Sequence, residues 1–159
     1  MRYELTEWLL TKGTDQWNSD FGIDRSEVER RVRHSIAEGG TWIALDGDEP
    51  AGSIAIDQIS DPGLWRAEEI AESLVLHRMM VRRRYAGHQL GRRMIAWAEQ
   101  IAMIEKHKWL RLDAWDTNAA LHAYYLSLGF ERVRHVPNHR FPSATLFQRA
   151  VPEWAALPS

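Results

Sequence analysis

Apolar residues recur at helical spacing in two segments near the N-terminus. Residues 5–12 predict a short helix that ends at Gly13, because glycine readily terminates helices. The next segment carries an apolar residue at every fourth position, at Val28, Val32 and Ile36. With Asp24 or Ser26 as the N-cap and Gly39 after the last turn, this spacing predicts a second helix.

The period then shortens to two, which is typical of β-strands. Residues 41–59 contain two β-prone runs around the polar turn GDEP, and this arrangement predicts a hairpin. Residues 73–81, SLVLHRMMV, are a third β-prone run, and residues 108–115 alternate. In that fourth run Leu110, Leu112 and Ala114 share one side, and Trp109, Arg111 and Asp113 share the other.

A longer helix is expected between the third and fourth strands. Its apolar residues follow steps of four, three, four and three: Leu90, Met94, Trp97, Ile101 and Ile104. Residues 118–129 predict a short helix that ends at Gly129, and residues 130–136 and 143–151 predict two closing strands. The resulting order of elements predicts one α/β domain around a mixed sheet, spanning residues 1–159.

Composition narrows the classes of function. The chain has 159 residues, with 20 Lys plus Arg against 22 Asp plus Glu, and a formal net charge of −2. A nucleic-acid-binding domain would usually carry a global basic excess, so no nucleic-acid partner is expected. Cysteine is absent, which excludes disulfides and a cysteine nucleophile and fits a reducing cytoplasm. No apolar run approaches the roughly 18 residues of a membrane span and no signal peptide is evident, so a cytoplasmic protein without a membrane partner is expected.

One stretch, VRRRYAGHQLGRRM at residues 81–94, concentrates five arginines around two glycines. It lies where a predicted strand ends and a predicted helix begins, and the first amides of a helix lack internal partners at the positive end of its dipole. Gly87 and Gly91 have no Cβ, so phosphates could approach the backbone closely. Arg92 and Arg93 are unfavourable at a helix N-terminus unless an anion binds there. The alternative is a solvated basic turn whose glycines serve conformation alone.

Residues 76–133 resemble the GCN5-related N-acetyltransferase (GNAT) family, because two separate motifs occur in the family's order and spacing. The pyrophosphate loop of that family has Arg or Gln, two residues, Gly, one residue, and then Gly or Ala. This register falls on residues 86–91, where Gly91 fits, Ala86 replaces the first side chain and Gln89 replaces the middle glycine. The resemblance implies a mixed, mostly antiparallel sheet with a splayed central strand pair, flanked by helices, and acetyl-CoA as co-substrate.

The resemblance also implies the parts of a cofactor site. Backbone groups of Met79, Met80 and Val81 would pair with the pantetheine arm of acetyl-CoA. The pyrophosphate would be surrounded by six residues of the loop: Gly87, His88, Gln89, Leu90, Gly91 and Arg92. Asn118 would hydrogen-bond the cofactor near its thioester, and the alternative is that Thr117 or Asn118 is a helix N-cap.

A general acid is implied by the same resemblance. An amine acceptor must lose a proton, because alkylamines titrate near ~10, and the oxyanion formed on attack needs a donor such as the backbone N–H of Val81. Tyr125 stands where the family carries the tyrosine that protonates the CoA thiolate. Tyr125 also shares a helical face with Leu121 and Leu128, so a core aromatic is the alternative, and Tyr124 is expected to pack.

Asp113 is the candidate general base. It lies five residues before Asn118, where ribosomal-protein N-acetyltransferases of this family carry a glutamate as proton acceptor. The alternative for Asp113 is an ion pair with Arg111 or another arginine. His77 and His88 could titrate near neutrality. Other carboxylates are also available as the base: Asp57, Glu68, Glu69, Glu72 and Asp116. There is no HExxH motif or Cys/His cluster, so no metal is expected. Because cysteine is absent, direct transfer in a ternary complex is favoured over a covalent acyl-enzyme.

The acceptor is expected to be a small-molecule amine or a peptide N-terminus. In the family, the entrance helices and their loop shape the acceptor pocket, and here that segment is rich in aromatic and acidic residues: Asp15, Trp17, Asp20, Phe21 and Asp24. The aromatic side chains could cover an apolar acceptor, and the acidic ones could attract a cationic acceptor. The alternative is an ordinary loop with buried anchors.

One departure from the family concerns the start of the chain. Family members usually begin with a strand, whereas MRYELTEWLL reads as already within the first helix. Either the strand is absent or the start is assigned late, and either case would expose a sheet edge that a second subunit of a homodimer could cover. Two other classes of function stay open, namely a catalytically silent acyl-CoA sensor and a basic interaction module.

Overall fold

The computed structural model of the chain describes residues 2–17 and 25–153. Its centre is one six-stranded sheet with the order β1-β2-β3-β4-β6-β5. The strands are β1 (Thr41–Asp46), β2 (Glu49–Asp57), β3 (Ser73–Val81), β4 (Trp109–Ala114), β5 (Glu131–His135) and β6 (Thr145–Ala150). The pair β3–β4 is parallel and the other pairs are antiparallel, so the expected mixed, mostly antiparallel sheet is confirmed.

The helices follow the predicted order with two additions. They are α1 (Arg2–Thr11), α2 (Arg25–Ala37), α3 (Ala67–Ala71), α4 (Leu90–Ile104) and α5 (Ala119–Ser127), together with the 3-10 turn η2 (Arg83–Tyr85). α3 and η2 were not predicted, because elements this short do not show an apolar period. The first helix begins at Arg2, earlier than residue 5 as predicted.

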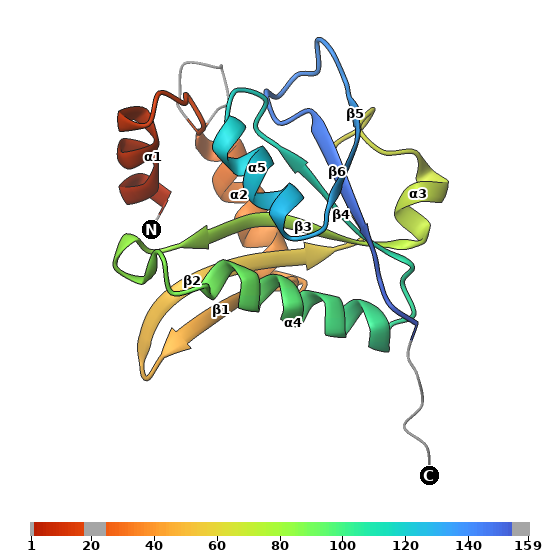
Figure 1. The fold of residues 1–159 in the computed structure, drawn as a ribbon, viewed down its shortest axis with the longest axis horizontal. Coiled ribbons are helices and arrows are strands. Elements are labelled where there is room, and N and C mark those ends of the chain that lie inside the picture. Colours follow the sequence, from red (N-terminus) through yellow and green to blue (C-terminus); the bar gives the residue numbers. More distant parts are fainter. Residues whose placement is uncertain (1, 18–24, 154–159) are drawn as a thin grey trace.

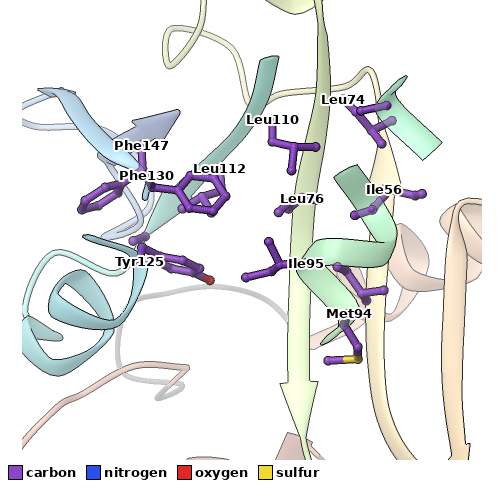
Figure 2. Close-up of a cluster of buried hydrophobic side chains, with 14 residues drawn as sticks. Ile56, Leu74, Leu76, Met94, Ile95, Leu110, Leu112, Tyr125, Phe130 and Phe147 are labelled. Atoms are coloured by element: carbon purple, nitrogen blue, oxygen red, sulfur yellow. The ribbon is translucent and has the colours of Figure 1, made fainter. Parts of the chain in front are cut away.

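Helices cover both faces of the sheet, with α4 on one face and α2 on the other (Figure 1). On β4 the predicted alternation is confirmed, because Leu110, Leu112 and Ala114 are almost fully buried in the core beneath α4. Figure 2 shows how side chains from the strands and from α4 meet in this core, among them Ile56, Leu76, Leu110, Met94 and Ile95.

The buried side of α4 differs in part from the predicted stripe. Met94 is buried as expected, but the other buried side chains are those of Ile95, Ala98 and Ala102, whereas Ile104 is 63% exposed. The two alanines let the helix approach the sheet closely, so the face that packs is the one that contains them. Leu90, Trp97 and Ile101 of the predicted stripe pack against the edge of this core, whereas Ile104 at its end does not.

The central parallel pair separates part of the way along its length. β3 and β4 pair from Ser73 with Trp109 to Leu76 with Leu112, and both strands continue beyond that last pair. Figure 1 shows the two strands diverging from there. This geometry confirms the splayed central pair.

The outer strand β1 pairs only with β2. Within residues 2–17 and 25–153, no strand precedes α1 and none pairs with the free edge of β1. The homodimer suggested for this edge stays a prediction. None of the helices in the described residues is both long enough and apolar enough to cross a membrane.

Candidate active site

A cavity of about 1060 Å³ opens where β3 and β4 separate. Its walls come from α2, from residues 56–62 at and after the end of β2, from β3, and from Asp113 and Trp115 at the end of β4. Tyr125 of α5 and Phe141 complete the lining used below. The volume is at the upper end of the range for small-molecule sites, which is roughly 300–1,000 Å³.

β3 contains a bulge in the wall of this cavity. The register with β2 shifts after His77, so that two residues, Arg78 and Met79, lie opposite the single Ile54. Arg78 has a φ of +47°, a left-handed conformation that costs a non-glycine residue about 1–2 kcal/mol. Met79 packs against the core, and the consecutive polar residues His77 and Arg78 both line the cavity.

His77 is paired with Asp57 inside the cavity. Its Nε2 lies 2.9 Å from Asp57 Oδ1 and 2.9 Å from the carbonyl oxygen of Ile59. Burial opposes the charge on His77, but the bond to Asp57 and the charges of Asp57 and Asp113 outweigh it and raise the pKa of His77. Burial likewise opposes the charge on Asp57, and His77 keeps the pKa of Asp57 below its usual value. Each of the two side chains therefore favours the charged form of the other.

Asp113 lies in the same cavity and accepts a short hydrogen bond from the Ser143 hydroxyl. Burial raises the pKa of Asp113, and the opposing effects of His77 and Ser143 do not cancel it. The alternative of an ion pair with Arg111 is wrong. Arg111 instead donates to the Ser73 hydroxyl at 2.7 Å, and no ion pair of Asp113 occurs among the residues that the structure describes.

Tyr125 is both a core residue and a cavity residue. It is 8% exposed, and its ring centroid lies 5.6 Å from that of Phe130 and 6.0 Å from that of Phe147. Figure 2 shows its hydroxyl end pointing away from these two rings, toward the side where Ile95 lies. Burial raises the pKa of Tyr125, and Asp113 is among the charges that add to this effect. The phenol therefore keeps its proton throughout the neutral range.

Tyr124 faces the start of α4. A Cβ built on Gly91 would lie 2.5 Å from the Tyr124 hydroxyl oxygen and 3.5 Å from its Cζ. Gly91 is buried, so the missing side chain at this position makes room for Tyr124. The expectation that Tyr124 packs is confirmed.

Two residues of the loop before α4, Gly87 and Gln89, have left-handed backbone conformations. Gly87 has a φ of +82°, and a Cβ there would meet nothing within 4 Å. Gln89 is the N-cap of α4 with φ 59° and ψ 17°, so the middle position of the motif has the conformation that glycine favours but carries a glutamine. His88 is exposed beside the Ala86 carbonyl, and Leu90 packs against the core.

The five loop arginines divide into two groups. Arg82, Arg83 and Arg84 contact, in that order, Glu4 at 3.9 Å, the ring of Trp8 at 4.0 Å and Glu49 at 3.0 Å. Arg92 and Arg93 are exposed on the first turn of α4, and no residue in the described part of the chain forms a hydrogen bond or ion pair with their side chains. Arg92 and Arg93 therefore have no such partner in the described residues and are free to bind an anion at the start of α4.

Backbone groups of β3 border the gap between the splayed strands. β2 pairs with one side of this segment, Met80 opposite Ser53 and Val81 opposite Gly52. On the other side, the pairing with β4 has already ended at Leu76, and no other described strand replaces it. The segment from Met79 to Val81 therefore has one edge open to a ligand.

Asn118 is the N-cap of α5, so the structural alternative given for it from the sequence is confirmed. Its Oδ1 accepts a backbone N–H in the first turn at 3.0 Å, and its Nδ2 donates to Gln16 Oε1 at 2.6 Å. Asp15 accepts from Trp115 Nε1 at 2.7 Å and from the Thr117 hydroxyl at 2.6 Å. These bonds hold the segment after α1 against the ends of β4 and α5.

The structure describes only part of the loop predicted to shape the acceptor pocket. Asp20, Phe21 and Asp24 lie outside the described residues. Trp17 lines the cavity, with the guanidinium of Arg2 5.9 Å from its ring centroid. Among residues 2–17 and 25–153, no group of three or more His, Cys, Asp or Glu side chains could hold a metal ion.

The Asp57–His77 pair and the placement of Arg78 in the cavity were not predicted from the sequence. One signal was present, because His77 and Arg78 are adjacent polar residues inside an apolar strand. Strict alternation would have placed one of them in the core, and a bulge avoids that burial.

Comparisons with known proteins find relatives in both sequence and fold. A sequence model of the acetyltransferase (GNAT) family matches residues 2–130. The chain is 31% identical over 128 residues to the uncharacterized N-acetyltransferase YesJ of Bacillus subtilis, which covers 79% of this chain and 69% of the relative. A GNAT-family acetyltransferase from Listeria monocytogenes has a similar structure, with a TM-score of 0.69 and 26% identity over 91% of this chain and 82% of that one. An aminoglycoside 6'-N-acetyltransferase complexed with coenzyme A shares the fold, with a TM-score of 0.59 and 14% identity over 79% and 81% of the two chains.

Proposed function

The chain belongs to the acetyltransferase (GNAT) family, and on that premise we propose that it transfers the acetyl group of acetyl-CoA to a primary amine. The observation that carries this proposal is the gap between β3 and β4, which is bordered by Tyr125, Asp113 and the open backbone edge of β3. The acetyl group moves by direct attack in a ternary complex, because the chain has no cysteine to form a thioester intermediate. The proposed location is the cytoplasm, because a chain without cysteine fits a reducing compartment.

The site fits acetyl-CoA at three places. The open edge of Met79 to Val81 offers backbone donors and acceptors to the pantetheine arm, in the manner of an added strand. The first amides of α4, together with Arg92, offer donors and positive charge to the pyrophosphate. Asn118 keeps one amide hydrogen and one lone pair beyond its two bonds within the protein, and these could serve the thioester end.

Each proposed proton transfer has a side chain at the cavity. Acetyl-CoA supplies the activated acetyl group. Asp113 accepts the proton of the acceptor ammonium, and burial moves its pKa upward, toward the working pH of a base. The backbone N–H of Val81 stabilises the oxyanion that forms as nitrogen attacks the carbonyl carbon. As the C–N bond forms and the C–S bond breaks, Tyr125 donates its proton to sulfur and the nitrogen releases its second proton to solvent. Tyr125 then regains a proton from Asp113, which restores both side chains.

The other two classes of function have less support. A basic interaction module would need the loop arginines free, but Arg82, Arg83 and Arg84 already contact residues of the protein. A silent acyl-CoA sensor would bind the cofactor without turnover. Such a sensor would not require a buried phenol and a half-buried carboxylate at the same gap.

The test is release of free CoA thiol from acetyl-CoA with a panel of amines, peptides and aminoglycosides, comparing the parent with Tyr125→Phe. The substitution keeps the ring that packs on Phe130 and Phe147. If Tyr125 is the general acid, kcat should fall by roughly 10²-fold or more, while the Kd for acetyl-CoA changes little.

Tyr124→Phe is the matched control, because it removes a neighbouring hydroxyl that packs on Gly91 and should retain most of the activity. Turnover of Tyr125→Phe within about twofold of the parent, with chemistry limiting the rate, would remove Tyr125 from the mechanism. Binding of acetyl-CoA without thiol release for any acceptor would instead support the sensor.

A further inference from the structure

Arg78 differs from the neighbouring Arg31 in how its charge is compensated. Arg31 donates to Asp61 at 2.8 Å and to Glu27 at 3.1 Å. Arg78 also lines the cavity, yet no residue that the structure describes forms a hydrogen bond or an ion pair with it. Its guanidinium is therefore available to a ligand that enters the cavity.

The fold holds Arg78 there at a cost. The bulge gives it a left-handed backbone with φ +47°, and its side chain is half-buried. Burial lowers the pKa of Arg78, although Asp57 and Asp113 oppose this effect, and an arginine keeps its charge at neutral pH all the same. A partly desolvated guanidinium without a hydrogen-bonded partner is unfavourable, so a bound anion would offset both the desolvation and the strain.

The carboxylates around Arg78 have other partners. Asp57 is paired with His77 at 2.9 Å, and Asp61 is paired with Arg31 at 2.8 Å. Asp113 accepts from a neutral hydroxyl, that of Ser143, and has no cationic partner among residues 2–17 and 25–153. The cavity thus combines a guanidinium that needs an anion with a carboxyl group that can face a cation.

We propose that the acceptor is an amine that also carries a carboxylate, as a free amino acid does, and that Arg78 binds this carboxylate while Asp113 faces the amine. The inference rests on the proposed function and names the substrate class for that site. The planar guanidinium matches a carboxylate in two parallel hydrogen bonds. A phosphate dianion would fit less well, because Asp57, Asp61 and Asp113 all act electrostatically on Arg78 and would repel the second negative charge.

The experiment compares sets of three acceptors that share a side chain. Each set contains an L-amino acid, its α-amide and the amine left after decarboxylation, and kcat/KM is measured by thiol release from acetyl-CoA. The parent should prefer the carboxylate of at least one set over its amide and its amine by about tenfold or more, the scale of a charge-assisted pair of hydrogen bonds. A parent that acetylates amines but prefers the amide or the decarboxylated amine in every set would overturn the inference and leave the proposed function intact.

Three variants locate the preference. Arg78→Gln should remove the preference for the carboxylate while leaving kcat/KM for the amide within about threefold, and Arg78→Lys should retain an intermediate preference because it keeps the charge without the fork. Arg140→Gln is the control, since Arg140 is 65% exposed and paired with Glu27 at 2.7 Å, and it should leave the preference unchanged. If Arg78→Gln lowers the rates of all three acceptors equally, or only lowers Tm, Arg78 is structural and the inference is wrong.

A binding measurement keeps the inference testable if no acceptor is turned over. In the presence of CoA, calorimetry should show an amino acid binding to the parent about tenfold or more tightly than to Arg78→Gln, with the amide binding equally to both. Equal binding of the amino acid to parent and variant would refute the role of Arg78. Absence of thiol release with this binding difference preserved would refute the proposed function alone.

Discussion

Gly91→Ala tests whether the proposed pyrophosphate loop ends in glycine because of bound phosphates or because of Tyr124. The added Cβ would lie 2.5 Å from the Tyr124 hydroxyl oxygen, well inside contact distance. The next nearest atom, Tyr124 Cζ, would lie at 3.5 Å, which is ordinary contact. Removing the hydroxyl with Tyr124→Phe should therefore make room for the new methyl group.

The magnitude follows from two opposing effects. Overpacking in a buried site costs about 1–3 kcal/mol, because the tyrosine must leave its rotamer or the helix must shift. Alanine in place of glycine in a helix gains up to about 1 kcal/mol, and less than that in the first turn. Gly91→Ala should therefore lower the free energy of unfolding by about 1–2 kcal/mol in the parent and leave it unchanged or slightly higher in Tyr124→Phe.

The assay is a double-mutant cycle in urea, with acetyl-CoA affinity measured by calorimetry on the same four proteins. The coupling energy between the two positions should be about 1–3 kcal/mol. Acetyl-CoA should bind normally to Gly91→Ala, Tyr124→Phe if packing alone requires the glycine. Additive effects on stability would refute the packing argument, and weak binding in the stable double variant would show that the phosphates need the missing Cβ as well.

Two further predictions concern the partly buried carboxyl groups of Glu69 and Asp113. Arg134 and the backbone and side chain of Arg66 hold the pKa of Glu69 at about 2, against 4.5 for a free carboxyl. Glu69 therefore stabilises the fold fully above pH 4.5 and loses this contribution as the pH falls toward about 2. By circular dichroism, Glu69→Gln should have a lower Tm than the parent at pH 7 and a smaller drop in Tm between pH 5 and 3. Equal acid profiles of the two proteins would contradict the assignment. Asp113→Asn removes the proposed base, so thiol release at pH 7 should fall by about 10²-fold or more and the remaining rate should lose the low-pH limb of the parent; a limb that persists would move the assignment to His77.

The sequence predicted most elements of the fold because their side-chain periods are local properties. The alternation in β4 placed Leu110, Leu112 and Ala114 in the core, and the spacing in α4 placed Met94 there. Gly129 was expected to end α5, and the helix ends two residues earlier, at Ser127. The separation of β3 from β4 was predicted from the family resemblance alone, because the apolar period within a strand does not show where two neighbouring strands diverge.

The cavity chemistry could not be predicted in the same way. Asp57 and His77 are 20 residues apart and meet only because β2 and β3 are paired antiparallel. The adjacent polar residues His77 and Arg78 hint at an irregularity in β3, but the position of the bulge is a property of the pairing with β2 and cannot be read from β3 alone. Ser143, the partner of Asp113, comes from a loop 30 residues further along.

For Tyr125 and Asn118, a structural role and the proposed catalytic or cofactor-binding role are compatible and depend on each other. Asn118 caps the start of α5 and bonds to Gln16, which fixes where the helix begins. Tyr125 follows seven residues after Asn118, and its ring packs against Phe130 and Phe147, so its hydroxyl has a defined direction. A general acid needs such positioning, because proton donation depends on geometry before pKa. Core packing of Tyr125 is therefore the means by which its hydroxyl would reach the gap, and only a substitution that keeps the ring can separate catalysis from folding.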